Sequence, residues 1–199
     1  IAFMRCIPNI VVSAPMNESE LRDLMYTAQL ETSEYPFVIR YPRGEGVLVD
    51  WKTPMKEIQI GKGRKLKDGD EIAILTFGHP GNFAASAIRD VKSEGINPAH
   101  YDMRFAKPID EEMLHEVFAK YKKIITVEDG TVVGGFGSAI LEFMNAFGYK
   151  ADVKIMGIPD RLVEHGTPKQ LYDEIGLDAN GIATEIRKMA FIEKRIPIS

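Results

Sequence analysis

The chain has 199 residues, of which 25 are Lys or Arg, 29 are Asp or Glu, and 45% are hydrophobic. This length allows one large domain or two small ones, and the net charge of −4 argues against a protein that binds nucleic acid or anionic membranes. No apolar stretch approaches the ~20 residues of a membrane-spanning helix, and the lone Cys6 cannot form an internal disulfide, so we expect a cytoplasmic protein.

The first fifty residues are predicted to form a strand, a helix and a strand. Residues 9–15 are a β-branched apolar run that ends in proline, and residues 36–41 are a second strand-like run. Between them, Asn17 followed three residues later by Glu20 is typical of a capping box at a helix start. The next apolar residues have the spacing of one buried helix face: Leu21, Leu24, Met25 and Ala28.

The rest of the chain alternates regularly between strands and helices. Residues 51–66 mix Gly, Pro and Lys without a helical period, which is typical of a linker. The pattern beyond them predicts strands over 71–77, 100–105, 123–128 and 152–158. It predicts helices over 82–94, 110–121, 137–147, 167–175 and 182–190. Such repeated units favour an α/β fold with a mostly parallel open sheet sandwiched by helices.

Polar side chains follow the predicted strands, at the edge where open parallel sheets bind ligands. They are His79, Asp102, Arg104, Glu128, Asp129, Asp160, Arg161, Glu164 and His165. In an enzyme built from this domain alone they would be the catalytic set, with His79 or His165 as the acid or base. The alternative, which we favour, is that they are ordinary polar strand ends, with Asp102 and Arg104 in an ion pair or a cap.

A glycine-rich turn, formed by Gly130, Gly134, Gly135 and Gly137, follows the third predicted strand of this sheet. Its backbone N–H groups and the following helix start suit a phosphate. The same glycines also suit close packing of the helix on a strand or on another subunit, and this interpretation is preferred. The four histidines and Cys6 have no metal-ligand spacing.

The segment Arg40-Tyr41-Pro42-Arg43-Gly44 places two guanidinium groups at the end of a predicted strand. Paired arginines suit bidentate recognition of a phosphate or a carboxylate. The alternative is one arginine paired with a neighbouring acid and one solvated arginine. The residues themselves leave both possibilities open.

Several segments occur in an order that resembles a known family. They are residues 4–9, 40–44 (Arg-Tyr-Pro-Arg-Gly), 102–110 (beginning Asp-Met-Arg-Phe), 126–129 with 134–138, and 157–160 with 165–167. Together they cover nearly the whole chain and resemble 1-deoxy-D-xylulose-5-phosphate synthases, a family of transketolase-like enzymes. The segments that begin at Arg40 and Asp102 are the most specific, whereas the β-α-β background is shared by all transketolase-like enzymes.

The resemblance implies a thiamine diphosphate-dependent transferase that condenses pyruvate with glyceraldehyde 3-phosphate with loss of CO2. It implies a homodimer with Mg²⁺ and a product that feeds isoprenoid, thiamine and pyridoxal phosphate synthesis. Residues 1–50 would be the C-terminal part of the pyrimidine-binding domain, 51–66 a linker, and 67–199 the transketolase C-terminal domain. The family's Gly-Asp-Gly motif and cofactor-activating glutamate are not found here, so we expect a fragment, beginning at Ile1, that is inactive alone.

The resemblance also assigns the arginines of the 40–44 segment. Arg43 matches an arginine that holds the phosphate of glyceraldehyde 3-phosphate, and Arg40 is a weaker candidate for the same role. No catalytic, cofactor-binding or metal-binding residue is carried over onto this chain. Two other functions stay open: the beta subunit of a 2-oxo acid dehydrogenase, and a non-catalytic dimerisation or scaffold module.

Overall fold

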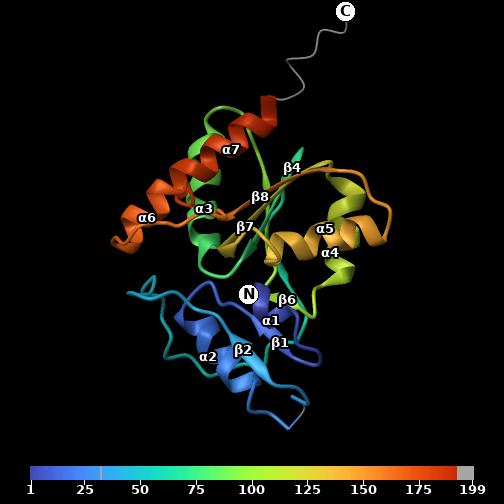
Figure 1. Cartoon of the computed structure of the whole chain (residues 1–199), viewed down its shortest axis with the longest axis vertical. Coiled ribbons are helices and arrows are strands. Elements are labelled where there is room, and N and C mark those ends of the chain that lie inside the picture. Colours follow the sequence, from blue (N-terminus) through green and yellow to red (C-terminus); the bar gives the residue numbers. More distant parts are fainter. Residues whose placement is uncertain (32, 192–199) are drawn as a thin grey trace, which may run out of the picture.

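A computed structural model describes residues 1–31 and 33–191, which form two sheets, one above the other in Figure 1. The smaller sheet has the order β2-β1-β6, from β1 (Val11–Ser13), β2 (Phe37–Ile39) and β6 (Phe105–Lys107). The larger sheet has the order β3-β5-β4-β7-β8. Its strands are β3 (Arg64–Lys67), β4 (Ile72–Phe77), β5 (Ala99–Asp102), β7 (Lys123–Thr131) and β8 (Asp152–Ile158).

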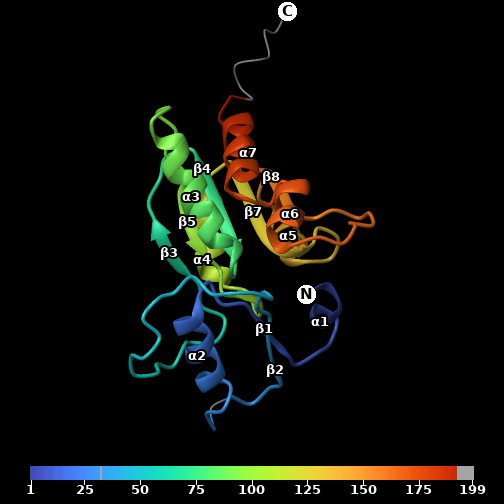
Figure 2. The same cartoon turned by 90° about the vertical axis from the view of Figure 1, so that its left-hand side faces the viewer.

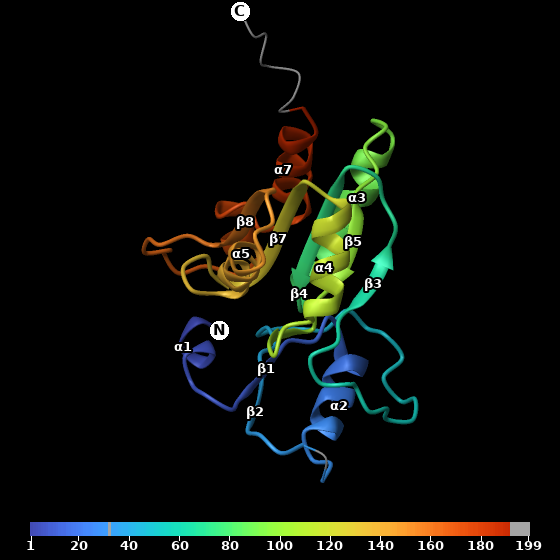
Figure 3. The ribbon, with the colours of Figure 1, turned by 90° about the vertical axis from the view of Figure 1, so that its right-hand side faces the viewer.

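The larger sheet confirms the predicted α/β architecture. Strands β5, β4, β7 and β8 pair in parallel, and only β3 is antiparallel, at the edge beside β5. Helices α3 (Pro80–Lys92) and α7 (Ala179–Phe191) cover one face, as Figure 2 shows. Helices α4 (Glu111–Lys120) and α5 (Phe136–Ala146) cover the other face, which is nearer the viewer in Figure 3. The remaining helices are α1 (Ala2–Arg5), α2 (Glu18–Thr27) and α6 (Pro168–Glu174).

Strand β4 shows why the sheet is covered on both sides. All six of its residues are buried. Ala73, Leu75 and Phe77 pack in the core under α4 and α5, whereas Ile72 and Ile74 pack under α3 and α7. Successive side chains of a strand point to opposite faces, so an unbroken apolar run such as this one requires helices on both faces. None of the helices in the described part of the chain is long and apolar enough to span a membrane.

The predicted strand over 100–105 is wrong in its second half. Strand β5 ends at Asp102, and Arg104 has a positive φ of 55°, which turns the chain out of the larger sheet. The backbone N–H of Ala14 then donates to the carbonyl of Arg104, and β6 pairs antiparallel with β1 of the smaller sheet. Residues 100–103 and Phe105 are buried, but the two halves of the run belong to different sheets.

Other sequence predictions need smaller corrections. The five helices predicted beyond residue 67 are all present within a few residues, and Thr167 with Gln170 forms a reciprocal capping box. In α2, Asn17 caps the helix as predicted, but the Glu20 carboxylate accepts from the Met16 N–H and does not close the box. The buried face of α2 is Glu20, Leu24 and Thr27, while Met25 is exposed.

The smaller sheet combines distant parts of the sequence. Its third strand, β6, comes from residues 105–107, inside the range predicted for the second domain, and β3 begins within the predicted linker. The two sheets are therefore joined by chain crossings as well as by side chains. The last eight positions of the predicted second domain, 192–199, lie outside the described residues.

Alanine substitutions at Gly78 and Gly95 test how closely the two sheets approach each other. Both have a positive φ, of 75° and 77°, but a Cβ on Gly78 would lie 2.6 Å from the Cβ of Ala14, whereas one on Gly95 would meet no described atom within 4 Å. We expect Gly95→Ala to lower the free energy of unfolding by about 1–2 kcal/mol from backbone strain alone. Gly78→Ala should cost about 1–3 kcal/mol more, because Ala14 must move. Urea denaturation measures both, and equal losses would contradict this account of the junction.

Candidate functional site

A cleft of about 970 Å³ opens between residues 42–45 and helix α6. Arg43 lines it from the first of these segments, and Lys169 and Tyr172 line it from α6. His79 and Phe83, which lie where β4 leads into α3, line it as well, as do residues 178–180. The cleft therefore lies at the carboxyl end of β4, the edge at which parallel sheets bind ligands.

The two arginines of the 40–44 segment have different environments. The Arg40 Nη2 donates to Oδ2 of Asp129 at 2.7 Å, and the Asp129 side chain is only 10% exposed. Arg43 is exposed at the cleft and has no hydrogen bond or ion pair to any described residue. Arg40 is thus committed to the protein, while Arg43 has all its donors available for a ligand.

Aromatic side chains support the cleft wall beside Arg43. The Phe83 ring packs edge-on against His79 and Tyr172, with centroids 4.8 and 5.3 Å away. The Tyr172 hydroxyl donates to Oδ2 of Asp129 at 2.8 Å. Burial raises the pKa of Tyr172, and the Asp129 carboxylate raises it further, so the hydroxyl stays a donor at neutral pH. Burial lowers the pKa of His79 and favours its neutral imidazole.

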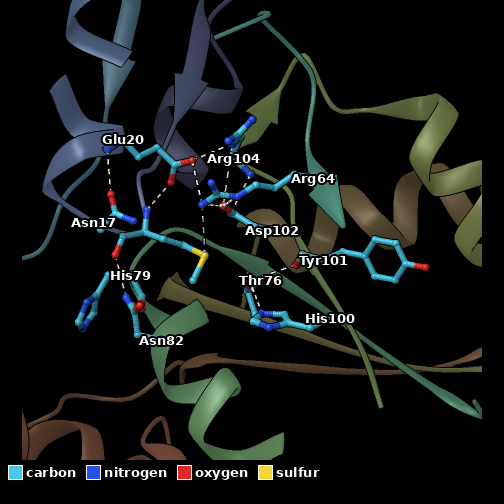
Figure 4. Close-up of polar contacts among 11 residues, drawn as sticks. Asn17, Glu20, Arg64, Thr76, His79, Asn82, His100, Tyr101, Asp102 and Arg104 are labelled. Carbon is cyan, nitrogen blue, oxygen red and sulfur yellow. Dashed lines mark hydrogen bonds and ion pairs between the residues drawn. The ribbon is translucent and has the colours of Figure 1, made fainter. Parts of the chain in front are cut away.

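A cluster of two carboxylates and two guanidinium groups lies at the junction of the sheets (Figure 4). Arg104 Nε donates to Glu20 Oε1 at 2.7 Å, and Arg64 contacts both Glu20, at 3.1 Å, and Asp102, at 2.9 Å. The Glu20 and Asp102 side chains are 4% and 0% exposed. The predicted pairing of Asp102 with Arg104 exists, but at 4.0 Å it is the longest contact of the cluster.

Burial dominates the electrostatics next to this cluster. It raises the pKa of Asp102 to about 7, with the Glu20 carboxylate as the next cause and the two arginines opposing the shift. His100 is 2% exposed, and its Nε2 lies 3.1 Å from the Thr76 hydroxyl. Burial, together with Arg64 and Lys67, lowers the pKa of His100 to about 4. The His100 imidazole is therefore neutral in the folded protein at physiological pH.

The glycine-rich turn has no room for a phosphate. The Glu128 carboxylate accepts from the N–H groups of Phe136 and Gly137 at 2.8 Å each, so it occupies the anion position at the start of α5. A Cβ on Gly137 would lie 2.6 Å from the Ile155 side chain. Close packing, the preferred interpretation of these glycines, is confirmed, and the phosphate alternative is wrong.

The polar strand ends do not form one catalytic set. His79 lines the cleft, Asp102 lies in the buried cluster, Glu128 caps α5, and Asp129 joins Arg40 to Tyr172. His165 is exposed, and Arg161 pairs with Glu174 on the surface. Across residues 1–31 and 33–191, no three His, Cys, Asp or Glu side chains converge to hold a metal ion.

The sequence patterns missed three residues of the buried cluster and the cleft: Glu20, Arg64 and Tyr172. Glu20 was interpreted as a local cap, and Arg64 lay in the predicted linker, yet both belong to the buried cluster. Tyr172 was recognised only as part of a helix. The predicted helix over 167–175 located α6 correctly but gave no indication that this helix faces the 40–44 segment.

Comparison with known proteins matches most of the chain. Residues 61–182 match the family described as transketolase, C-terminal domain. A 1-deoxy-D-xylulose-5-phosphate synthase from Cytophaga hutchinsonii is 61% identical over 190 residues, and one from Bacteroides thetaiotaomicron is 56% identical over 188. These alignments cover 96% and 94% of this chain but only 30% and 29% of the relatives, so the chain spans under a third of their length.

Solved structures agree with these matches. A chain described as "Split gene transketolase, inactive beta4 tetramer" superposes with a TM-score of 0.82 at 29% identity, covering 94% of this chain and 60% of that one. A Pichia stipitis transketolase variant has a TM-score of 0.68 at 17% identity, over 98% of this chain and 27% of that one. The second match shows a shared fold.

A conservative substitution in the buried cluster should have a large effect on the free energy of unfolding. Glu20→Gln removes the anion that Arg104 and Arg64 share, and breaking a buried ion pair in this way costs about 3–5 kcal/mol of unfolding free energy. Glu94→Gln is the matched control, because Glu94 pairs with Arg187 on the surface, where water screens the charges. Chemical denaturation compares them, and similar losses for the two variants would contradict a stabilising role of the cluster.

The buried imidazole of His100 should make the free energy of unfolding depend on pH. Its pKa is about 4 in the folded chain and about 6.5 when unfolded, so the unfolded state takes up the proton first as the pH falls. The stability that comes from neutral His100 is complete above pH 6.5 and falls by about 3 kcal/mol on acidification to pH 4. Between pH 6.5 and pH 4, the unfolding free energy of the wild type should therefore fall by this amount relative to that of His100→Gln. A stability difference that stays constant from pH 7 to pH 4 would show that His100 does not titrate as stated.

Proposed function

This chain belongs to the transketolase C-terminal domain family, and we propose that it is the C-terminal portion of a 1-deoxy-D-xylulose-5-phosphate synthase. The reaction would condense pyruvate with glyceraldehyde 3-phosphate and release CO2. The single observation that carries the proposal is the 61% identity to a protein of that name across 96% of this chain. The specific segments that begin at Arg40 and Asp102 point the same way.

Arg43 is the residue we propose to bind substrate, through the phosphate of glyceraldehyde 3-phosphate. It lines the large cleft with its guanidinium unpaired among the described residues, and Lys169 adds a second cation to the wall. A guanidinium binds phosphate through two parallel charge-assisted hydrogen bonds. Arg40 was the weaker candidate, and we propose a structural role for it, because Asp129 already occupies its Nη2.

Thiamine diphosphate and Mg²⁺ are the cofactors we propose for the complete enzyme. The described residues do not fit either group: no acidic or histidine cluster could hold the metal, and Glu128 fills the anion position at α5. We therefore assign both cofactors to the part of the relatives' length that this chain does not span.

We expect this chain alone to assemble into an oligomer but to have no enzymatic activity. The split-gene transketolase chain that they resemble is described as an inactive tetramer, and we propose a homodimer for the complete enzyme. The isolated chain, supplied with pyruvate, glyceraldehyde 3-phosphate, thiamine diphosphate and Mg²⁺, should release no CO2. The 2-oxo acid dehydrogenase alternative is less favoured, because the relatives reported above bear the synthase name.

Arg43→Ala in the complete enzyme tests the phosphate contact. Loss of a charge-assisted hydrogen-bonding partner should lower kcat/KM for glyceraldehyde 3-phosphate about 10- to 100-fold. Values for D-glyceraldehyde, which lacks the phosphate, and the KM for pyruvate should change by less than about twofold. Arg89→Ala, on the exposed side of α3, is the control. An equal loss with both aldehydes would refute phosphate binding by Arg43.

A further inference from the structure

Asp129 lies where three parts of the fold meet. It belongs to β7 of the larger sheet, and its Oδ2 accepts from Arg40, at the end of β2 in the smaller sheet, and from Tyr172 of α6. Both distances, 2.7 and 2.8 Å, are those of strong hydrogen bonds to a carboxylate. One oxygen atom thus ties β2, β7 and α6 together.

This bridge sits under the segment that carries Arg43. The Arg40 backbone N–H donates to the Ser13 carbonyl at 2.8 Å, which fixes its main chain on β1, while Asp129 fixes its side chain. Pro42 and Gly44 lie between and after the arginines, and residues 42–45 are exposed or half-buried along the cleft. Arg43 itself has no described partner to hold it. Its position therefore depends on the anchoring of Arg40, three residues earlier.

The opposite wall of the cleft depends on the same carboxylate. The Tyr172 ring is held by Phe83, 5.3 Å away, and lies 6.1 Å from His79, so its hydroxyl is aimed at Asp129 by packing. His79 is a further titratable group near Asp129; burial lowers the pKa of His79, so its neutral imidazole leaves the carboxylate to Arg40 and Tyr172. Asp129 thus links Arg40, just before the segment that carries Arg43, to Tyr172 of α6.

We propose that Asp129, with Tyr172 as its second partner, is a positioning residue that places Arg43 for the phosphate of the aldehyde substrate. This inference rests on the proposed function of Arg43. Asp129 does not touch the substrate; it acts through Arg40 and through the α6 wall. Neither the strand-end pattern nor the family resemblance gave it this role.

The test uses the complete enzyme with Asp129→Asn and Tyr172→Phe, and measures glyceraldehyde 3-phosphate against D-glyceraldehyde. Misplacing a binding group by about 1 Å is enough to cost up to ~100-fold. We expect Asp129→Asn to lower kcat/KM for the phosphorylated aldehyde at least about tenfold, and Tyr172→Phe about threefold, with D-glyceraldehyde and pyruvate nearly unaffected. In an Arg43→Ala background, adding Asp129→Asn should change the value by less than about twofold, because both changes act on one contact.

Controls separate positioning from general damage. Glu174→Gln removes a carboxylate of α6 that pairs with Arg161 but lies outside the cleft wall, and it should leave the aldehyde preference unchanged. If Asp129→Asn does not fold, Tyr172→Phe decides, since it deletes one hydroxyl and keeps the ring.

Four results would overturn the proposal. Equal losses with both aldehydes, or unchanged preference in Asp129→Asn and Tyr172→Phe while Arg43→Ala is selective, would refute the positioning role and leave the proposed function intact. Additive losses in the double variant would refute it as well. An Arg43→Ala enzyme that keeps its preference for the phosphorylated aldehyde would refute the proposed phosphate contact and this inference together.

Discussion

The arrangement of the molecule depends on the buried charge cluster between its two sheets. Two carboxylates, Glu20 and Asp102, are 4% and 0% exposed, and each is reached by a guanidinium from another segment. Removing charges from water costs several kcal/mol per ion unless partners compensate for it. Because Glu20 contacts both guanidinium groups and Asp102 contacts Arg64, loss of either carboxylate would leave an arginine of the junction with fewer partners. The smaller sheet is thereby held in one position on the larger one.

The candidate site inherits its geometry from that docking. Arg40 and Arg43 come from the smaller sheet's β2 end, whereas Tyr172 and Lys169 come from a helix of the larger sheet's layer. The cleft between them exists only if the two layers keep their relative placement. The charge cluster fixes this placement on the side of β3 and β5, and the Asp129 bridge fixes it on the side of β7. The two layers thus have polar contacts at two separate places, in addition to the apolar core that they share.

Local sequence patterns predicted the positions of helices and strands better than the contacts between them. Helical spacing located α3, α4, α5 and α7, because each of them buries apolar residues against the larger sheet, whereas α6 has no buried residue. The strand over 100–105 failed because hydrophobicity does not record which sheet a residue enters; the turn at Arg104 depends on tertiary contacts. The capping box predicted for Glu20 was wrong for a related reason. A carboxylate near a helix start can either cap the helix or bind a distant cation, and here Glu20 pairs with the two arginines of the cluster.

The glycine-rich turn and the paired arginines show how an ambiguous motif is resolved. Both patterns are suited to phosphate, and in both the deciding fact is whether a carboxylate of the protein already occupies the donors. Glu128 occupies the N–H groups at α5, and Asp129, the next residue, occupies Arg40. Arg43 differs only in having no such partner among the described residues. Two adjacent acids of one strand thus close two of the three anion sites that the sequence offers, and leave the third open at the cleft.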